Sequence, residues 1–90
     1  MANSQSAKKR IRQNEKRRQQ NANVRSRVRT WLNRFEKAVE SGDLDEAEER
    51  LREVEARLDR AVNKGVIPKN RASRKTSRLY KRLNRLRAEA

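Results

Sequence analysis

Residues 44–63, LDEAEERLREVEARLDRAVN, carry the clearest fold signal in the chain. Their apolar positions alternate spacings of three and four, which is typical of an amphipathic helix: Leu44, Ala47, Leu51, Val54, Leu58 and Ala61. Ser41-Gly42-Asp43 precedes them, and Gly42 suits the left-handed position that follows a helix. Asp43 suits an N-cap, with Glu46 as its reciprocal capping-box partner. The sequence therefore predicts a helix that starts directly after Asp43.

Two more apolar stripes at helical spacing lie on either side of this segment. The earlier stripe contains Val24, Val28, Trp31, Leu32, Phe35 and Val39. The later stripe contains Ala72, Thr76, Leu79, Leu83 and Leu86. Gly65 suits the end of the second helix, and Pro68 suits the first turn of a third. Because three apolar stripes need a shared core and short connections make neighbours antiparallel, we expect an all-α, antiparallel three-helix bundle. It forms a single domain over residues 1–90, with helices at about 6–41, 44–63 and 68–88.

The first predicted helix has a long polar extension. Its apolar stripe begins only at Val24, yet nothing in residues 7–23 breaks a helix. That stretch is polar nearly all round and cannot pack on the bundle by apolar burial. We expect it to project either as a long basic rod or as a frayed tail, and to gain its stability from a binding partner rather than from the bundle.

The charge balance predicts a polyanionic partner. The chain has 26 Lys and Arg against 12 Asp and Glu, a net charge of +14. Residues 1–35 carry net +10, residues 36–62 net −5 and residues 63–90 net +9. The two ends should therefore contact nucleic acid. An anionic membrane surface is less suitable as a partner, because residues 7–23 lack the broad apolar face that membrane binding requires.

The residue inventory argues against catalysis. The sequence has no His, no Cys and no Gly-rich phosphate loop. Its carboxylates cluster in residues 43–59, where Arg residues at helical spacing make a solvated, charge-paired face the simplest interpretation. We therefore expect no enzyme activity, no metal site and no cofactor. No apolar run approaches a membrane span, so we expect a soluble, cytoplasmic protein.

The third predicted helix carries one stripe of cations at spacings of four and three: Arg71, Lys75, Arg78, Arg82 and Arg85. Such a stripe can follow phosphates along a groove. Asn70 and Ser77 can add hydrogen bonds, and Lys64 and Lys69 flank the preceding loop. Since the sequence has only three aromatic residues, and Trp31 and Phe35 fall on the apolar stripe, we expect recognition of RNA shape and backbone rather than base stacking.

Several motifs resemble the family of bacterial small-subunit ribosomal protein number twenty: Met1-Ala2-Asn3, Lys9-Arg10-Ile11-Arg12, Ser41-Gly42-Asp43-Leu44, Lys64-Gly65-Val66-Ile67-Pro68-Lys69-Asn70, Arg74-Lys75 and Ser77-Arg78-Leu79. The resemblance covers nearly the whole chain. The chain departs from the family at Pro68, where members commonly have His. Any contact that the His ring makes in the family is therefore missing here. The chain is also richer in Arg than is usual for the family, which keeps the charge and adds bidentate geometry.

This resemblance implies a three-helix bundle with a long first helix that binds small-subunit ribosomal RNA directly and neutralises its phosphates so that RNA helices can pack. It also implies a monomer within the ribosome, with neighbouring ribosomal proteins as further partners. An architectural DNA-binding protein of the nucleoid is the alternative that charge alone leaves open. The predicted RNA contacts are Lys8, Lys9, Arg10, Arg12, Lys16, Arg17, Arg18, Arg25, Arg29, Lys64, Lys69, Asn70, Arg71, Arg74, Lys75, Ser77, Arg78, Lys81 and Arg82.

Overall fold

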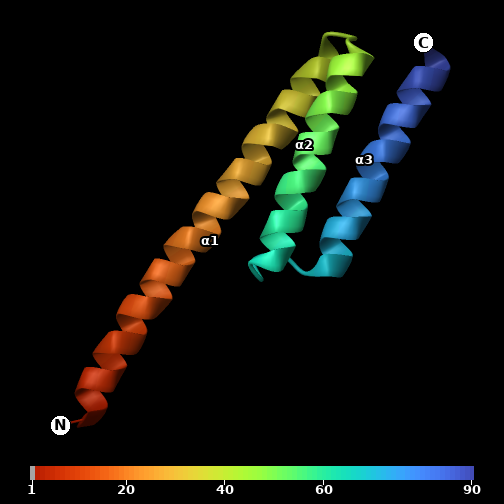
Figure 1. Cartoon of the computed structure of the whole chain (residues 1–90). Coiled ribbons are helices and arrows are strands. Elements are labelled where there is room, and N and C mark those ends of the chain that lie inside the picture. The colour runs from red at the N-terminus through yellow and green to blue at the C-terminus, as the bar shows by residue number, and fades with distance from the viewer. Residues whose placement is uncertain (1) are drawn as a thin grey trace.

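Three α-helices account for nearly all of the chain in the computed structural model, which describes the backbone of residues 2–90 and the side chains of residues 5–90. Helix α1 spans Ala2–Glu40, α2 spans Leu44–Asn63 and α3 spans Lys69–Glu89 (Figure 1). The all-α, antiparallel arrangement predicted from the sequence is confirmed. The molecule is elongated, measuring 68 × 23 × 13 Å, because α1 is about twice as long as its neighbours.

The core consists of the three predicted apolar stripes. Phe35 from α1 and Leu51, Val54 and Ala61 from α2 are 0% exposed, and Leu83 is the most buried large side chain of α3. The side chains of Trp31, Leu32, Leu79 and Tyr80 pack around this cluster and are partly buried. Ala38 is also buried, although it was not assigned to the α1 stripe; it is small enough to lie where α1 approaches its neighbour closely.

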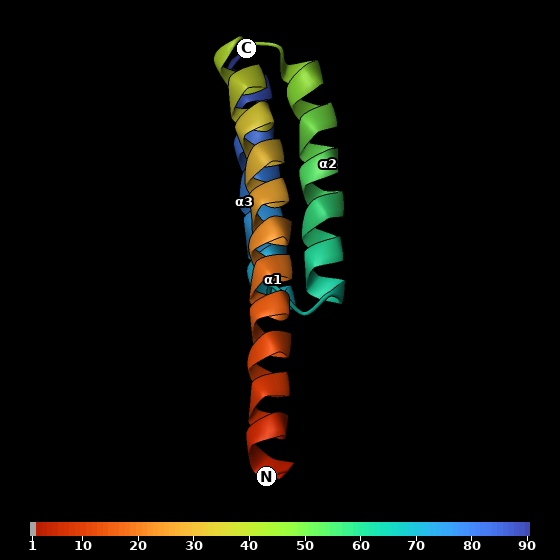
Figure 2. The ribbon, with the colours of Figure 1, turned by 90° about the vertical axis from the view of Figure 1, so that its left-hand side faces the viewer.

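Helix α2 is the central element, since its backbone packs against both α1 and α3 while the backbones of α1 and α3 do not meet. Figure 1 shows α2 running between the other two helices, and Figure 2 shows it displaced to one side of both. The three axes therefore form an open triangle with α2 at its apex. This arrangement leaves a groove between α1 and α3, with Leu58 of α2 at its base.

The turn between α1 and α2 follows the sequence prediction closely. Gly42 has φ +79°, and the amides of Gly42 and Asp43 donate to the carbonyls of Val39 and Ala38, which together form a Schellman motif. The Asp43 carboxylate accepts from the Glu46 amide at 3.1 Å, as expected of an N-cap. The reciprocal half of the predicted capping box is absent, because the Asp43 amide already donates to Ala38.

The second turn differs from the prediction by one residue. Gly65 has φ +74°, and the amides of Gly65 and Val66 close a second Schellman motif on Val62 and Ala61. Pro68 was predicted in the first turn of the third helix, but it is the N-cap, with an extended ψ of 142°, and α3 starts at Lys69. Its carbonyl accepts the first helical bond from Ala72, a role that needs no amide hydrogen on the proline itself.

The polar extension of α1 is a continuous helix, so the rod is the conformation that the structure adopts. We call residues 5–20 the rod, because every side chain in this range is exposed. Figures 1 and 2 show it extending well beyond the loop that joins α2 to α3. Asn21 is the first residue of α1 with a partly buried side chain, where the helix reaches the bundle.

Candidate nucleic-acid interface

The groove between α1 and α3 brings cations from two helices together. Arg25 and Arg29 of α1 line one wall, and Arg71 and Lys75 of α3 line the other. Its remaining lining is apolar and comes from all three helices and the second turn: Val28, Leu32, Leu58, Val66, Ile67 and Ala72. We call this site the α1–α3 groove. All four of its cations belong to the contacts predicted from the sequence.

The cations of the α1–α3 groove have no acidic partner within the described residues. The ion pairs within the described residues instead involve Arg50, Arg52, Arg82 and Arg87. Four uncompensated charges around an apolar base attract an anion that can span both walls. A phosphodiester backbone has this character, since its oxygens accept from guanidinium pairs and its sugars can lie against apolar side chains.

Arg82, which is one of the predicted contacts, has an acidic partner within the protein. Its guanidinium forms a bidentate pair with the Glu36 carboxylate, with Nη1 and Nη2 at 2.5 and 2.9 Å from the two oxygens, and lies 6.0 Å from the centre of the Phe35 ring. The hydrogen bond to Glu36 raises the pKa of Arg82 further above its ordinary value. The pair connects α3 to α1 and neutralises a charge that the sequence assigned to RNA.

A second depression runs along the first half of α3. It is lined by Pro68, Asn70, Arg71, Arg74, Lys75 and Arg78. Because Arg71 and Lys75 line both this depression and the α1–α3 groove, the two form one continuous basic surface. Lys69, Ser77 and Lys81 are exposed on α3 but line neither site.

The rod carries cations on all its flanks. Lys8, Lys9, Arg10, Arg12, Lys16, Arg17 and Arg18 are all exposed. At about 100° per residue, Lys16, Arg17 and Arg18 point in three directions. A shallow depression formed by Arg17, Arg18, Asn21 and Arg25 with Asn14 and Ala22 links this part of the rod to the α1–α3 groove.

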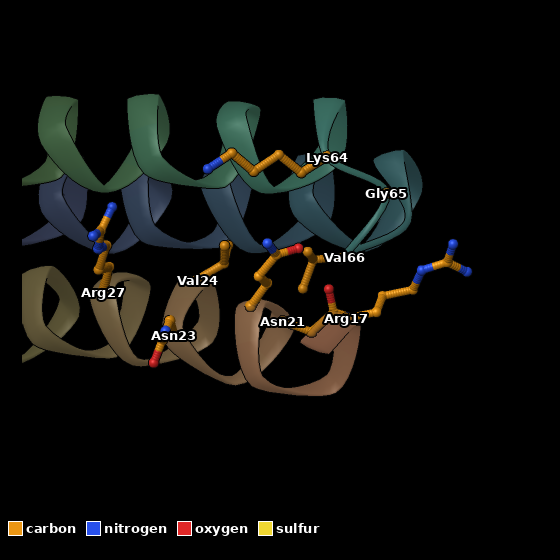
Figure 3. Close-up of a pocket in the computed structure, with 9 residues that line it drawn as sticks. Arg17, Asn21, Asn23, Val24, Arg27, Lys64, Gly65 and Val66 are labelled. Carbon is orange, nitrogen blue, oxygen red and sulfur yellow. The ribbon is translucent and has the colours of Figure 1, made fainter. Parts of the chain in front are cut away.

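The junction between the rod and the bundle forms a further polar recess, which we call the junction recess. It lies between α1 and the second turn and contains Arg17, Asn21, Arg27 and Lys64 (Figure 3). In Figure 3 the Lys64 side chain runs along α2, whereas the Arg17 side chain extends in the opposite direction, past the second turn. Arg27 was not among the predicted contacts. Its flank of α1 is brought close to Lys64 only by the position of the second turn, which the sequence does not reveal.

The described residues offer little for other chemistry. Residues 2–90 contain no group of three His, Cys, Asp or Glu side chains placed to hold a metal ion. None of the three helices is long and apolar enough to cross a membrane. Two acidic residues of α2 pair along the helix, Glu46 with Arg50 at 3.4 Å and Glu48 with Arg52 at 3.1 Å.

Comparison with known proteins agrees with this geometry. The model of the family described as ribosomal protein S20 matches residues 2–84. A small ribosomal subunit protein bS20 from Dinoroseobacter shibae is 52% identical, with 98% of this chain and 100% of the relative covered. Proteins of the same name from Halalkalibacterium halodurans and Methylococcus capsulatus are 52% and 48% identical, with 97% and 100% of this chain and 96% and 98% of the relatives covered. The chain belongs to the ribosomal protein S20 family.

Proposed function

We propose that this chain is a structural constituent of the small ribosomal subunit that binds small-subunit ribosomal RNA directly and neutralises its phosphates, so that RNA helices can pack side by side. The α1–α3 groove carries the proposal. Arg25, Arg29, Arg71 and Lys75 surround it from two helices, and none of them has an acidic partner in the described residues. Membership of the S20 family supports the same function.

The mechanism follows from electrostatics. Each cation that meets a phosphate releases condensed counterions, and this release drives binding that weakens as salt rises. The shared core of the three helices holds the two walls of the groove at a fixed separation, so binding does not have to organise them. The protein acts as a monomer in the bacterial ribosome and therefore in the cytoplasm, and this role requires neither a cofactor nor a metal ion.

Nucleoid DNA remains the competing ligand for a basic helical protein. Architectural DNA-binding proteins often insert apolar side chains between base steps. Ile11, which is 58% exposed on the rod, is the one large apolar side chain that is exposed among residues 5–90. A single exposed isoleucine among cations provides a weak wedge, so the structure favours backbone recognition over intercalation.

The test compares a folded fragment of small-subunit ribosomal RNA with duplex DNA of similar length at physiological salt. We expect tighter binding to the RNA fragment, and weaker RNA binding by the variant Arg29→Gln/Arg71→Gln. The matched control is Arg52→Gln/Arg60→Gln, which removes two exposed charges from α2 away from the groove. Equal affinity for DNA and RNA, or equal losses in the two variants, would contradict the proposed function.

A further inference from the structure

The bidentate pair of Glu36 with Arg82 is the single ion pair between α1 and α3 among the described residues. The backbones of these two helices do not meet, so the pair spans the open side of the triangle. The Arg82 guanidinium also lies 6.0 Å from the centre of the Phe35 ring, which belongs to the core. Two side chains with fixed supports therefore connect the two helices that form the walls of the α1–α3 groove.

The pair lies on the same flanks of the two helices as the cations of the α1–α3 groove. Glu36 follows Arg29 by seven residues, and Arg82 follows Lys75 by seven residues. Seven residues make nearly two helical turns, so each partner lies on its own wall, about 10 Å along the axis from the nearest groove cation. Because α1 and α3 run in the same direction (Figure 1), the pair closes one end of the groove.

The α1 wall changes sign at this end of the groove. Arg25 and Arg29 line it within the groove, whereas Glu36 and Glu40 occupy the same flank farther along the helix. The α3 stripe, in contrast, stays basic as far as Arg85. The two walls can thus hold a phosphate between them only on the near side of the pair.

A phosphate would have to compete with Glu36 for the Arg82 guanidinium. Such an exchange would break both hydrogen bonds of the bidentate pair. It would also leave the Glu36 carboxylate beside the phosphate, where the two negative charges repel each other. The hydrogen bond to Glu36 raises the pKa of Arg82, which shows that the carboxylate already stabilises this charge. The closed pair is thus the favoured arrangement when RNA occupies the groove.

We propose that Glu36 is a specificity-determining residue of the α1–α3 groove, because it withholds Arg82 from phosphate and ends the path that phosphates can follow between the two walls. A long, straight backbone that runs on past the pair meets Glu36 and Glu40 and is disfavoured. A folded RNA whose backbone turns away after the four groove cations is not. This inference rests on the proposed function, since it takes RNA as the ligand, and it makes Arg82 a positioning residue.

The experiment compares variants by the salt dependence of their binding to one folded fragment of small-subunit ribosomal RNA. Glu36→Gln frees Arg82 for phosphate, so the slope of log affinity against log salt should steepen by about 0.9. Arg82→Gln should leave the slope unchanged, because Arg82 does not touch phosphate in the wild type. Glu36→Gln/Arg82→Gln should return to the wild-type slope, whereas a mere shift of the walls would persist in this double variant.

The matched control is Glu48→Gln, which also removes one carboxylate and an ion pair between helices, the pair with Arg87. Arg87 follows Arg82 by five residues, so it lies about 140° farther round α3, away from the groove flank. The slope of this control should equal that of the wild type. Both pairs are more than one-third exposed, so every variant should fold, and circular dichroism should show equal helix content.

Duplex DNA of similar length is the second ligand and measures selectivity. Glu36→Gln should gain more affinity for the DNA than for the RNA fragment. An unchanged slope in Glu36→Gln, a slope reduced by about 0.9 in Arg82→Gln, an equal gain in Glu48→Gln, or equal gains for both ligands would overturn this inference. A wild type that binds both ligands equally would overturn the proposed function, while the slopes of the variants would still test whether Glu36 ends the phosphate path.

Discussion

A triple substitution in the rod can measure how many of its sides contact RNA. Lys16, Arg17 and Arg18 are exposed and consecutive, so they point in directions about 100° apart. Changing all three to Ala removes three charges while keeping strong helix formers in the rod. RNA that lies along one side of the rod can reach one or two of these residues, whereas RNA that surrounds the rod reaches all three.

The size of the effect distinguishes these geometries. A lost phosphate contact lowers the slope of log affinity against log salt by about 0.9. One-sided binding therefore predicts a slope reduction of about 0.9 to 1.8, and an enclosed rod predicts about 2.7. Since no flank of residues 5–20 is covered by the bundle, we expect a reduction of at least one contact and weaker binding at low salt.

The assay is fluorescence anisotropy with a labelled fragment of small-subunit ribosomal RNA, repeated from low to moderately high salt. The control variant changes Gln13, Gln19 and Gln20 to Ala, which alters the same stretch of the rod without changing its charge. Its slope should match that of the wild type. An unchanged slope in the Lys16, Arg17 and Arg18 variant would refute the idea that the rod lies on RNA.

Four further predictions concern stability and order. Phe35→Ala should lower the free energy of unfolding by about 3–5 kcal/mol in chemical denaturation, because Phe35 is fully buried; a loss below 1 kcal/mol would mean that the core does not depend on it. Gly42→Ala should lower the free energy of unfolding by about 1 kcal/mol. The cause is backbone strain at φ +79° alone, because no atom lies close enough to clash with a new Cβ. An unchanged free energy of unfolding would contradict the left-handed turn. Tyr80→Phe should cost about 1 kcal/mol by removing the 2.9 Å hydrogen bond to Glu55. Burial, and then this hydrogen bond, raise the pKa of Tyr80 above 10.0. The contribution of Tyr80 to the free energy of unfolding is therefore fully present below pH 10.0 and should disappear as pH rises through the folded-state pKa. A difference in stability between the wild type and Tyr80→Phe that stays constant in alkaline solution would refute this. Residues 7–23 should exchange amide hydrogens fast in the free protein and slowly in the RNA complex, and strong protection without RNA would show that this stretch is stable by itself.

The fold was largely predictable because its signals are local. The alternating apolar positions of α2, the left-handed Gly42 and the Asp43 N-cap each depend on residues within a few positions of one another. The start of α3 was placed one residue early, because Pro68 has a φ that suits both the N-cap and the first helical turn, and the preceding Ile67 cannot cap by its side chain.

The candidate site was less predictable, because it depends on which flanks of the helices meet. In the sequence, Arg82 is one more cation of the α3 stripe. Its partner Glu36 lies 46 residues earlier in the chain, so the sequence pattern does not reveal the pair. Trp31 of α1 likewise lies beside Arg50 and Arg57 of α2, with which it shares no sequence pattern. Only the open triangle of helices distinguishes the cations that line a groove from those that are merely exposed.

The acidic residues explain how two strongly basic helices share one bundle. Glu36 connects α1 to α3 through Arg82, and Glu48 connects α2 to α3 through Arg87. These pairs are more than one-third exposed, and exposed pairs contribute about 0–1 kcal/mol each, so the apolar stripes provide most of the stability. The acidic residues instead determine which cations are neutralised within the protein. The cations left over lie mainly on the rod, in the α1–α3 groove and along α3, and their mutual repulsion is the reason to expect an anionic partner.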